Sequence, residues 1–274
     1  MTPETVFPKV SESTKAKWPN ADVEYLILDN DSFIVFIDSH IDIDWETTPA
    51  YDEKGPKDAK KHNDILNRAA AIECIPNDHQ RESIRMNFKR MIGEGVARSL
   101  DHDYDNATQI LDQAEKYITE RNIETARIWQ LTSSTVTGLA CAFIGLVPLW
   151  SFRLFFLQHW GETALFSCLA ACAGAVGANL SFIFRIGKTR TTSEASKRLH
   201  ILESICRILG GAICGLIVSF LIQLGILIPI LKNGNNTHLA MVTAGFIAGA
   251  SERWVPSLIA KIESSSIGAK EKSP

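Results

Sequence analysis

A short row of alternating acidic and imidazole side chains is the first feature of this sequence that could do chemistry. Its members are Asp38, His40, Asp42 and Asp44. On an extended strand all four would share one face, and carboxylates with an imidazole in one row could bind a divalent metal ion. The residues between them are apolar, so a solvated strand face with the apolar side packed inward explains the same alternation. We expect the solvated face, with a metal site as the alternative.

No other group of residues indicates catalysis. The sequence shows no nucleophile with its base, no glycine-rich phosphate loop and no second acidic cluster. Its six cysteines include no CxxC pair, which argues against a zinc site or a disulfide framework. We therefore predict no catalytic residues, no cofactor and no enzymatic activity. A membrane-tethered metal-dependent enzyme is the alternative that the acidic row leaves open.

Two charged residues, Glu252 and Arg253, interrupt the last apolar segment of the chain. Ionisable groups at membrane depth are costly and are usually paired or functional, and adjacent residues of a helix point about 100° apart. We expect Glu252 to pair with Arg185 or Arg207 on a neighbouring helix and Arg253 to reach the lipid headgroups. A gate or ion path is the alternative. Glu203 and Arg207, four residues apart, are expected to form a helical ion pair.

Asn179 and Gln223 are isolated amides within apolar segments. Each could line a pore or join two helices by a hydrogen bond. Together with Glu252 and Arg253 they are the candidates for a pore or gate. So few polar groups argue against a transporter with a charged substrate site in the middle of the membrane.

The elements that must position these residues belong to two halves of opposite charge. Residues 1–127 hold 16 Lys and Arg against 25 Asp and Glu, a net charge of −9, and residues 128–274 hold 12 against 6, a net charge of +6. The first 22 residues contain prolines and lysines but no apolar run. We therefore expect no secretory signal peptide and an N-terminus in the cytosol.

The second half contains four apolar segments, and crossing a bilayer takes about 20 mostly apolar residues. The segments cover residues 131–150, 163–186, 205–231 and 238–259. A backbone in lipid has to satisfy its own hydrogen bonds, which predicts that each segment is a helix. The predicted fold class is an integral membrane α-helical protein, with four transmembrane helices preceded by a small cytosolic α+β domain.

The links between these segments predict their orientation. The link between the second and third segments and the C-terminal tail are rich in Lys and Arg, whereas the other two links offer only Arg153 and Lys232. The positive-inside rule places the basic side in the cytosol, so we predict a multi-pass protein of the cell inner membrane with both termini cytosolic. Contact with anionic lipid explains the basic link without nucleic acid. The expected outer aromatic belt consists of Trp150, Phe152, Phe155, Phe156 and Trp160.

Small residues recur one helical turn apart in three of the apolar segments. They are Gly174 and Ala178, Gly211 and Gly215, and Gly245 and Gly249. Such pairs let helix backbones approach closely in lipid. The contacts that they make lie either within one four-helix bundle or between the subunits of an oligomer.

Three stretches of the second half carry a resemblance: GAVGANLSFIFRIGKTR (174–190), RILGGAICGLIVSFLIQLGIL (207–227) and AGFIAGASERWVPSLI (244–259). They are similar to a four-helix membrane module of uncharacterised bacterial proteins. In that module a Gly-rich helix ends in a basic cytosolic loop, an Arg opens the next helix, and the last helix ends in a Gly-Phe-x-Ala-Gly-x-Ser-Glu-Arg signature. The resemblance implies the architecture, and it implies varied cytosolic domains, some of them in phage-defence settings.

The first half begins with a predicted β-hairpin. Residues 23–28 and 32–37 are strand-like runs around Asp29-Asn30-Asp31, a composition typical of a hairpin turn. Helices are predicted over 58–74 and 79–100, followed by an amphipathic helix from residue 106 that meets no helix breaker before Trp129. The predicted regions are an N-terminal segment (1–57), a cytosolic helical region (58–127), a four-helix transmembrane module (128–262) and a polar tail (263–274).

These features lead to one functional hypothesis and one alternative. We expect an oligomeric bacterial membrane effector, in which the cytosolic domain senses a protein or ligand and the helices alter membrane permeability, with antiphage defence as the setting that the resemblance implies. The alternative is a passive membrane scaffold that recruits a cytosolic partner through its acidic domain. The expected partners are the lipid bilayer, further copies of the chain and a cytosolic protein or ligand, without direct nucleic-acid binding.

Overall fold

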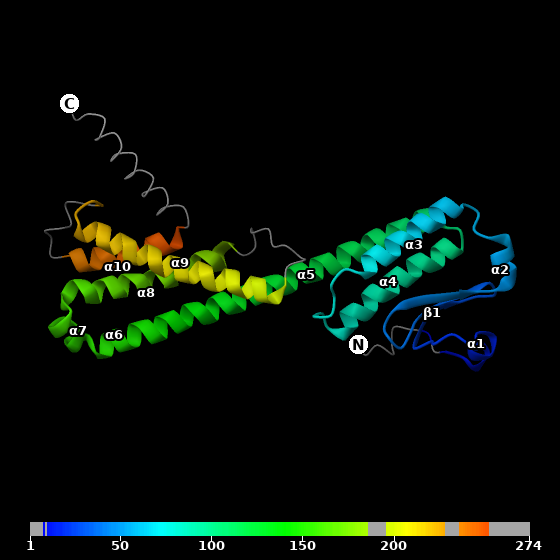
Figure 1. Ribbon diagram of the computed structural model, residues 1–274, viewed down its shortest axis with the longest axis horizontal. Helices are drawn as coiled ribbons and strands as arrows, with labels where there is room; N and C mark the ends of the chain where they lie inside the picture. Colours follow the sequence, from blue (N-terminus) through cyan, green and yellow to red (C-terminus); the bar gives the residue numbers. More distant parts are fainter. Residues whose placement is uncertain (1–7, 9, 186–195, 228–235, 252–274) are drawn as a thin grey trace, which may run out of the picture. The chain divides into compact units, whose positions relative to one another are not determined.

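The computed structural model describes residues 8, 10–185, 196–227 and 236–251. The chain forms two units, Met1–Thr125 and Ala126–Pro274, which are called the N-terminal and C-terminal units below. The N-terminal unit combines a three-stranded antiparallel sheet with helices, whereas the described part of the C-terminal unit is helical (Figure 1).

The sheet of the N-terminal unit consists of β1 (Tyr25–Asp29), β2 (Phe33–Ile37) and β3 (Ile43–Thr47), antiparallel in that order. The first two strands are the predicted hairpin. Its turn is fixed by the Asn30 side-chain oxygen, which accepts hydrogen bonds of 2.8 Å from the backbone N–H groups of Ser32 and Phe33. The third strand extends the predicted hairpin to a three-stranded sheet.

The alternating segment from Asp38 to Asp44 is not one extended strand. The Asp38 side chain accepts hydrogen bonds from the backbone N–H groups of His40 (3.0 Å) and Asp42 (2.7 Å), and Ile41 has a φ of 66°. Aspartate stabilises tight turns in this way, so Asp38, His40 and Asp42 belong to the β2–β3 turn and only Asp44 lies on β3. The expectation that the four side chains share one strand face is wrong.

Strand β2 is buried along its whole length because the sheet is covered on both faces. On one face its side chains join a core that includes α4 (Glu82–Leu100). On the other face they pack around Trp18, which follows α1 (Glu12–Lys17). The Trp18 indole N–H donates a hydrogen bond of 3.0 Å to Asp29, which ties this segment to the end of β1.

Helices α3 (Ala59–Glu73) and α4 correspond to the helices predicted over 58–74 and 79–100, and the short α2 (Pro49–Lys54) precedes them. The Asp58 side chain caps α3 by accepting a hydrogen bond of 3.1 Å from the Lys61 N–H. Apolar residues at helical spacing on α3 and α4 pack into the core, as an amphipathic pattern predicts.

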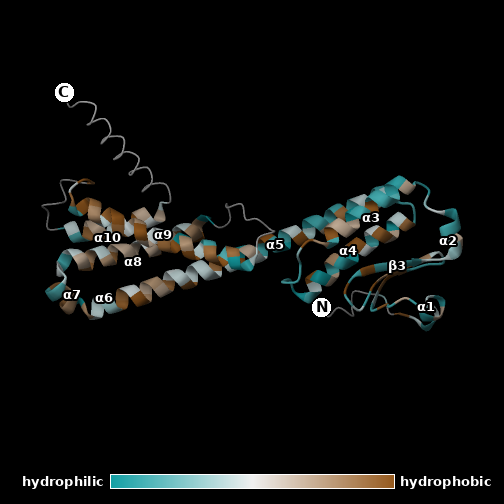
Figure 2. Cartoon of the chain, in the orientation of Figure 1, coloured by the Kyte–Doolittle hydropathy of each residue, from teal (hydrophilic) through white to brown (hydrophobic). Residues whose placement is uncertain are grey.

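One long helix, α5 (Tyr104–Cys141), includes residues of both units. Its buried stripe begins with Ala107, Leu111, Ala114 and Ile118 and continues at four-residue spacing through Asn122, Ala126, Gln130 and Ser134. The residues of the helix change along its length from mostly hydrophilic to mostly hydrophobic (Figure 2). The amphipathic helix predicted from residue 106 therefore continues into the first apolar segment.

Three further helical elements lie between α5 and the second apolar helix. A π-helical turn over Ala142–Leu146 leads into α6 (Val147–Ser151), and α7 (Arg153–His159) precedes α8 (Gly161–Arg185). Taken together, α5, the π-helical turn and α6 form a helical stretch over residues 104–151 that is long and apolar enough to cross a membrane.

The remaining helices are α9 (Lys197–Gln223) and α10 (Thr237–Ala250). By length and composition α8 and α9 can also cross a membrane, and α10 is a shorter apolar helix. Helix α9 begins earlier than the predicted segment 205–231. It also ends earlier, because the chain adopts a φ of 74° at Gly225, a conformation that terminates helices. The predicted segment 238–259 is described only as far as Ser251, and its remaining residues lie outside the described part of the chain.

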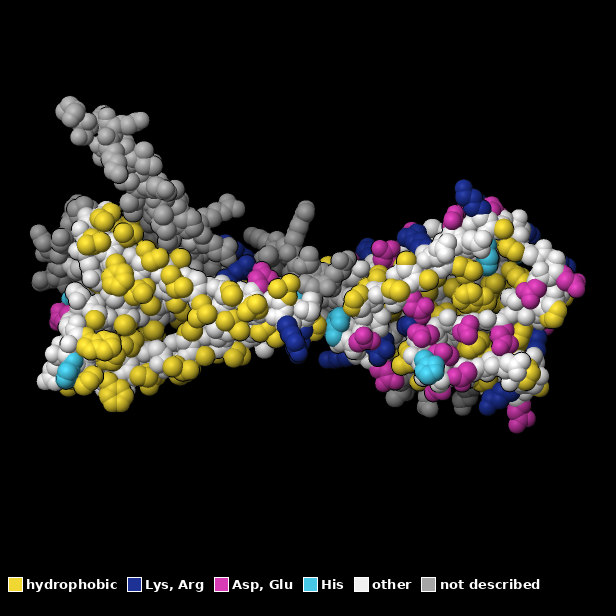
Figure 3. Space-filling model, in the orientation of Figure 1, with side chains coloured by type: hydrophobic (Ala, Val, Ile, Leu, Met, Phe, Trp, Pro, Cys, Tyr) yellow, Lys and Arg dark blue, Asp and Glu magenta, His cyan; other side chains and the backbone are white. Residues whose placement is uncertain are grey.

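The two units differ in what they expose. Among the described residues, the N-terminal unit exposes only Leu28 and Trp45 as large apolar side chains. The C-terminal unit exposes many, including Ile144 at 75% and Phe184 at 79%. In Figure 3 hydrophobic side chains cover the helices of the C-terminal unit, whereas acidic side chains gather on the N-terminal unit.

Candidate functional site

Helices α8, α9 and α10 contact one another through glycine, and Gly174 of α8 lies at the centre of that contact. A Cβ atom added at Gly174 would overlap the Gly211 carbonyl oxygen and lie 3.1 Å from the Gly215 Cα atom. A Cβ atom added at Gly249 would lie 2.6 Å from the Gly174 Cα atom. The backbones of α9 and α10 therefore both lie directly against that of α8.

The adjacent turns of α8 continue this contact. A Cβ atom added at Gly245 would lie 2.6 Å from the Ala170 carbonyl oxygen, and one added at Gly211 would lie 2.5 Å from the Ala178 Cβ atom. All six of the small residues predicted to pack thus meet within one chain: Gly174, Ala178, Gly211, Gly215, Gly245 and Gly249. The sequence analysis missed Gly177, which packs against the backbone of Phe246.

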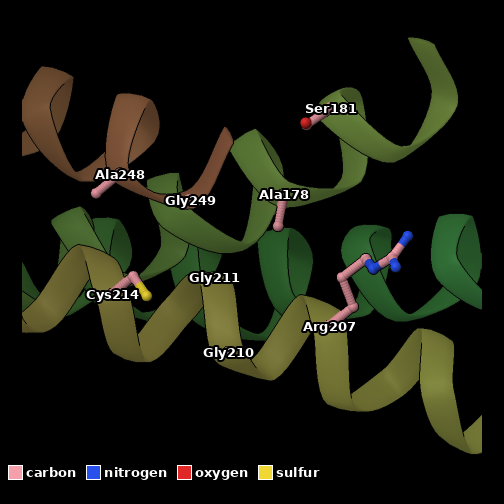
Figure 4. A pocket seen from close by; sticks show the side chains of 8 residues that line it. All are labelled: Ala178, Ser181, Arg207, Gly210, Gly211, Cys214, Ala248 and Gly249. Carbon is pink, nitrogen blue, oxygen red and sulfur yellow. The ribbon is translucent and has the colours of Figure 1, made fainter. Parts of the chain in front are cut away.

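A pocket of about 260 Å³ opens beside this glycine contact. Small residues of the three helices line most of it, and a Cβ atom added at Gly210 would have no neighbour within 4 Å. Figure 4 shows Ala248 and Cys214 near one end of the pocket and Ser181 and Arg207 toward the other. The described lining residues suit an apolar group, and no two of their side chains are arranged for proton transfer.

Arg207 lies on the pocket wall and forms the predicted helical ion pair with Glu203, at 3.7 Å. Its guanidinium also lies over the Phe182 ring, 5.1 Å from the centroid. Arg185 donates a hydrogen bond of 3.5 Å to the Ala250 carbonyl oxygen, which links the end of α8 to the end of α10. Glu252 and Arg253, and with them the predicted pairing of Glu252, lie outside the described residues.

The two amides predicted as pore or gate candidates lie on different helices, Asn179 on α8 and Gln223 at the end of α9, and they contact distant points of α8. Gln223 donates a hydrogen bond of 2.7 Å to the Ser167 hydroxyl and so joins α9 to α8. Asn179 packs against Gly138 of α5, and its side-chain oxygen is buried without a hydrogen-bond partner among the described residues. Ser167 and Asn179 are separated by about 18 Å along α8, given 1.5 Å per residue. This geometry favours the role of Gln223 in joining helices over a shared pore lining.

A buried polar cluster between α5 and α9 was missed by the sequence analysis. The Gln130 side-chain nitrogen lies 3.1 Å from His200 Nδ1 and 3.2 Å from a Glu203 carboxylate oxygen. The Ser204 hydroxyl donates to the Gln130 carbonyl oxygen at 3.3 Å and to that of His200 at 2.9 Å. The spacing of His200, Glu203 and Ser204 on one helix face was the available signal, but nothing in the sequence points to Gln130 as their partner.

The proposed metal ligands of the N-terminal unit have separate roles. Asp38 stabilises its turn, Asp42 lies 3.3 Å from the Lys89 ammonium, and Asp44 is exposed and accepts a hydrogen bond from the Trp45 N–H. Among the described residues, no three His, Cys, Asp or Glu side chains are grouped so that they could hold a metal ion.

A serine–histidine pair also occurs in the N-terminal unit. The Ser99 hydroxyl lies 2.8 Å from His62 Nδ1, the contact that a nucleophile and its base would make. Ser99 is fully buried, however, and burial lowers the pKa of His62 below its ordinary value. A substrate has no access to this hydroxyl, so the pair belongs to the core.

No family model, curated protein or solved structure matches the chain. The similarity to a bacterial four-helix membrane module therefore stays a prediction.

Proposed function

We propose that the C-terminal unit is embedded in the bacterial inner membrane, which the chain crosses four times, and that the N-terminal unit lies in the cytosol. The observation that carries this proposal is the large exposed apolar surface of α5 to α10. Its exposure to water would be unfavourable, and lipid would cover it. The fourth crossing would combine α10 with the residues that follow it.

The positions of charged and aromatic residues support this orientation. Arg185 ends α8 and Lys197 begins α9, so the basic side coincides with one end of these helices. Trp150, Phe152 and Trp160 surround α7 at the link between the first and second crossings, and each is more than 60% exposed. Cations on the cytosolic side and aromatic rings at the lipid interface follow the usual distribution.

We infer that the protein is a membrane effector that acts as an oligomer and alters membrane permeability. In the most apolar stretch of the first crossing 11% of the window is buried, compared with 39% for α8 and 33% for α9. The surface of the first crossing is therefore available to a second copy. Glycine contacts bring α9 and α10 each against the α8 backbone, which favours a path for ions between copies over one among these three helices. Helix α5 would carry a signal from the N-terminal unit, with antiphage defence as the proposed setting.

Membrane potential in cells tests this function. Expression of the protein should depolarise cells, as read by a voltage-sensitive dye, and Gly249→Leu should abolish the effect because leucine cannot fit against Gly174. Gly210→Ala is the matched control, because nothing lies within 4 Å of the added atom.

A passive scaffold is the second candidate, and the acidic side chains gathered on the N-terminal unit favour it (Figure 3). Under this alternative the membrane potential stays unchanged in both the original protein and the Gly249→Leu variant. A soluble partner would then be retained on the membrane only when the N-terminal unit is present.

A further inference from the structure

A polar pocket of about 550 Å³ lies in the N-terminal unit, a volume in the range of small-molecule sites. Its walls come from the β2–β3 turn, the end of α3, the link between α3 and α4, and α4. The β2–β3 turn contributes Asp42, the end of α3 contributes Glu73, and two successive turns of α4 contribute Arg85 and Lys89. The charged groups are not distributed evenly around it.

One end of the pocket holds more acid than base. The Lys89 side chain is 6% exposed, and its ammonium lies 2.6 Å from a Glu73 carboxylate oxygen and 3.3 Å from an Asp42 carboxylate oxygen. The same Glu73 oxygen accepts a hydrogen bond from the Ile43 N–H at 3.2 Å. Two carboxylates share one ammonium, so this end carries an excess of negative charge, which water partly screens at Asp42 because its side chain is 68% exposed, and this end favours a cation.

At the other end of the pocket, Arg85 has terminal N–H groups that could donate to a ligand. Arg85 Nε donates to the Asn77 side-chain oxygen at 3.3 Å, and Asn77, which is 8% exposed, is held in turn by a hydrogen bond of 2.9 Å to the Ile75 carbonyl oxygen. The nearest carboxylate, that of Asp78, lies 3.8 Å away and is 97% exposed, so water screens its charge. The terminal N–H groups of the positioned guanidinium therefore favour an oxyanion.

We propose that this pocket binds a small zwitterion, with its acidic group on Arg85 and its ammonium group on the Asp42 and Glu73 carboxylate oxygens that Lys89 does not contact. Lys89, which holds the two carboxylates, is one turn from Arg85 on α4, about 5–6 Å between Cβ atoms, so the two ends of the pocket suit a ligand whose charges are separated by a short chain. The apolar residues Ile41, Ile75 and Pro76 in the lining would contact that chain. The role of the zwitterion as the signal that the N-terminal unit receives rests on the proposed function. The binding of the zwitterion does not depend on that function.

Titration calorimetry on the full-length protein in detergent micelles tests the binding. The zwitterionic probes are γ-aminobutyrate and O-phosphoethanolamine, which present a carboxylate and a phosphate respectively, and the single-charge controls are butyrate and butylammonium. At least one zwitterion should bind with a Kd of about 1 mM or tighter, at least tenfold more tightly than either control. The preferred probe identifies the acidic group.

Variants identify the site. Arg85→Gln and Asp42→Asn, both at partly exposed side chains, should each weaken binding at least tenfold, whereas Arg98→Gln on the same helix should leave it unchanged. Absence of binding by both zwitterions at about 10 mM, which is tenfold above a millimolar Kd, overturns the proposal. Equal binding of a single-charge control, or binding that both pocket variants retain, also overturns it. Because calorimetry needs no membrane activity, a failure here is distinct from a failure to depolarise cells.

Discussion

Gly249 of α10 lies so close to Gly174 of α8 that a Cβ atom added at Gly249 would be 2.6 Å from the Gly174 Cα atom. Backbone atoms cannot yield as the end of a flexible side chain can, so any larger residue has to push the two helices apart. This contact makes α8 the centre of the C-terminal unit.

We predict that Gly249→Ala destabilises the C-terminal unit by about 1–3 kcal/mol, the usual cost of overpacking. Gly210→Ala is the control, because it adds the same atom to α9 where nothing lies within 4 Å, and alanine favours a helix over glycine. Thermal unfolding in detergent measures both. Equal midpoints for the two variants would show that the close contact is absent in the membrane protein.

The hydrogen bond between Gln223 and Ser167 should join α9 to α8 without lining a pore. A double-mutant cycle with Gln223→Leu and Ser167→Ala is expected to give a coupling energy of about 0.6 kcal/mol, typical of such bonds between membrane helices. Depolarisation by the Gln223→Leu variant should persist. Its loss in a variant that still assembles would instead place Gln223 in an ion path.

The N-terminal unit should lose stability as the pH falls below neutrality. Burial lowers the pKa of His62 from its ordinary value of 6.5, an effect that hydrogen bonding to Ser99 partly offsets. Between the folded and unfolded pKa values the unfolded chain binds more protons, so the stability contributed by neutral His62 is complete above pH 6.5 and declines as the pH falls through that window.

Hydrogen exchange of α3 and α4 in the full-length protein, at about pH 7.5 and 5.5 and corrected for the intrinsic rate, measures this effect. Protection should be lower at the acidic pH, and His62→Gln should reduce the difference between the two conditions. Unchanged dependence in the variant would assign the effect to other groups.

Asn122 should be the most sensitive polar residue on the N-terminal part of α5. It is 2% exposed, donates to the Pro76 carbonyl oxygen at 2.9 Å and accepts from Gln80 at 2.8 Å. Asn122→Ala removes the donor to the Pro76 carbonyl oxygen and one of the acceptors of Gln80, which keeps its bond to Thr125, at a cost of about 1–3 kcal/mol. Chemical denaturation should show that loss, and the exposed Asn67→Ala should change stability by less than about 0.5 kcal/mol.

Local patterns predicted much of the fold. The spacing of apolar residues located α3, α4 and α5, and the Asp29-Asn30-Asp31 turn located the first two strands, because these features depend on neighbouring residues. The turn at Asp38 was missed because its side chain bonds to the backbone of His40 and Asp42, a local interaction that an alternating pattern conceals.

The sites depend on contacts that sequence spacing does not contain. Pairs of small residues identified the glycine contact but not which helices meet there. Gln130 and His200 are 70 residues apart, and Lys89 meets both Glu73 and Asp42 across three elements. Such clusters become visible only when the helices and strands are placed in space.

Accessibility of Cys74 tests the membrane placement most directly, because this thiol is exposed on the N-terminal unit. A membrane-impermeant maleimide would be applied to intact spheroplasts and to inverted membrane vesicles, with a variant that keeps Cys74 and carries alanine at the other cysteine positions. We predict modification in inverted vesicles only. Modification in intact spheroplasts, or recovery of the protein in the soluble fraction without detergent, would contradict a cytosolic N-terminal unit attached to helices in the membrane.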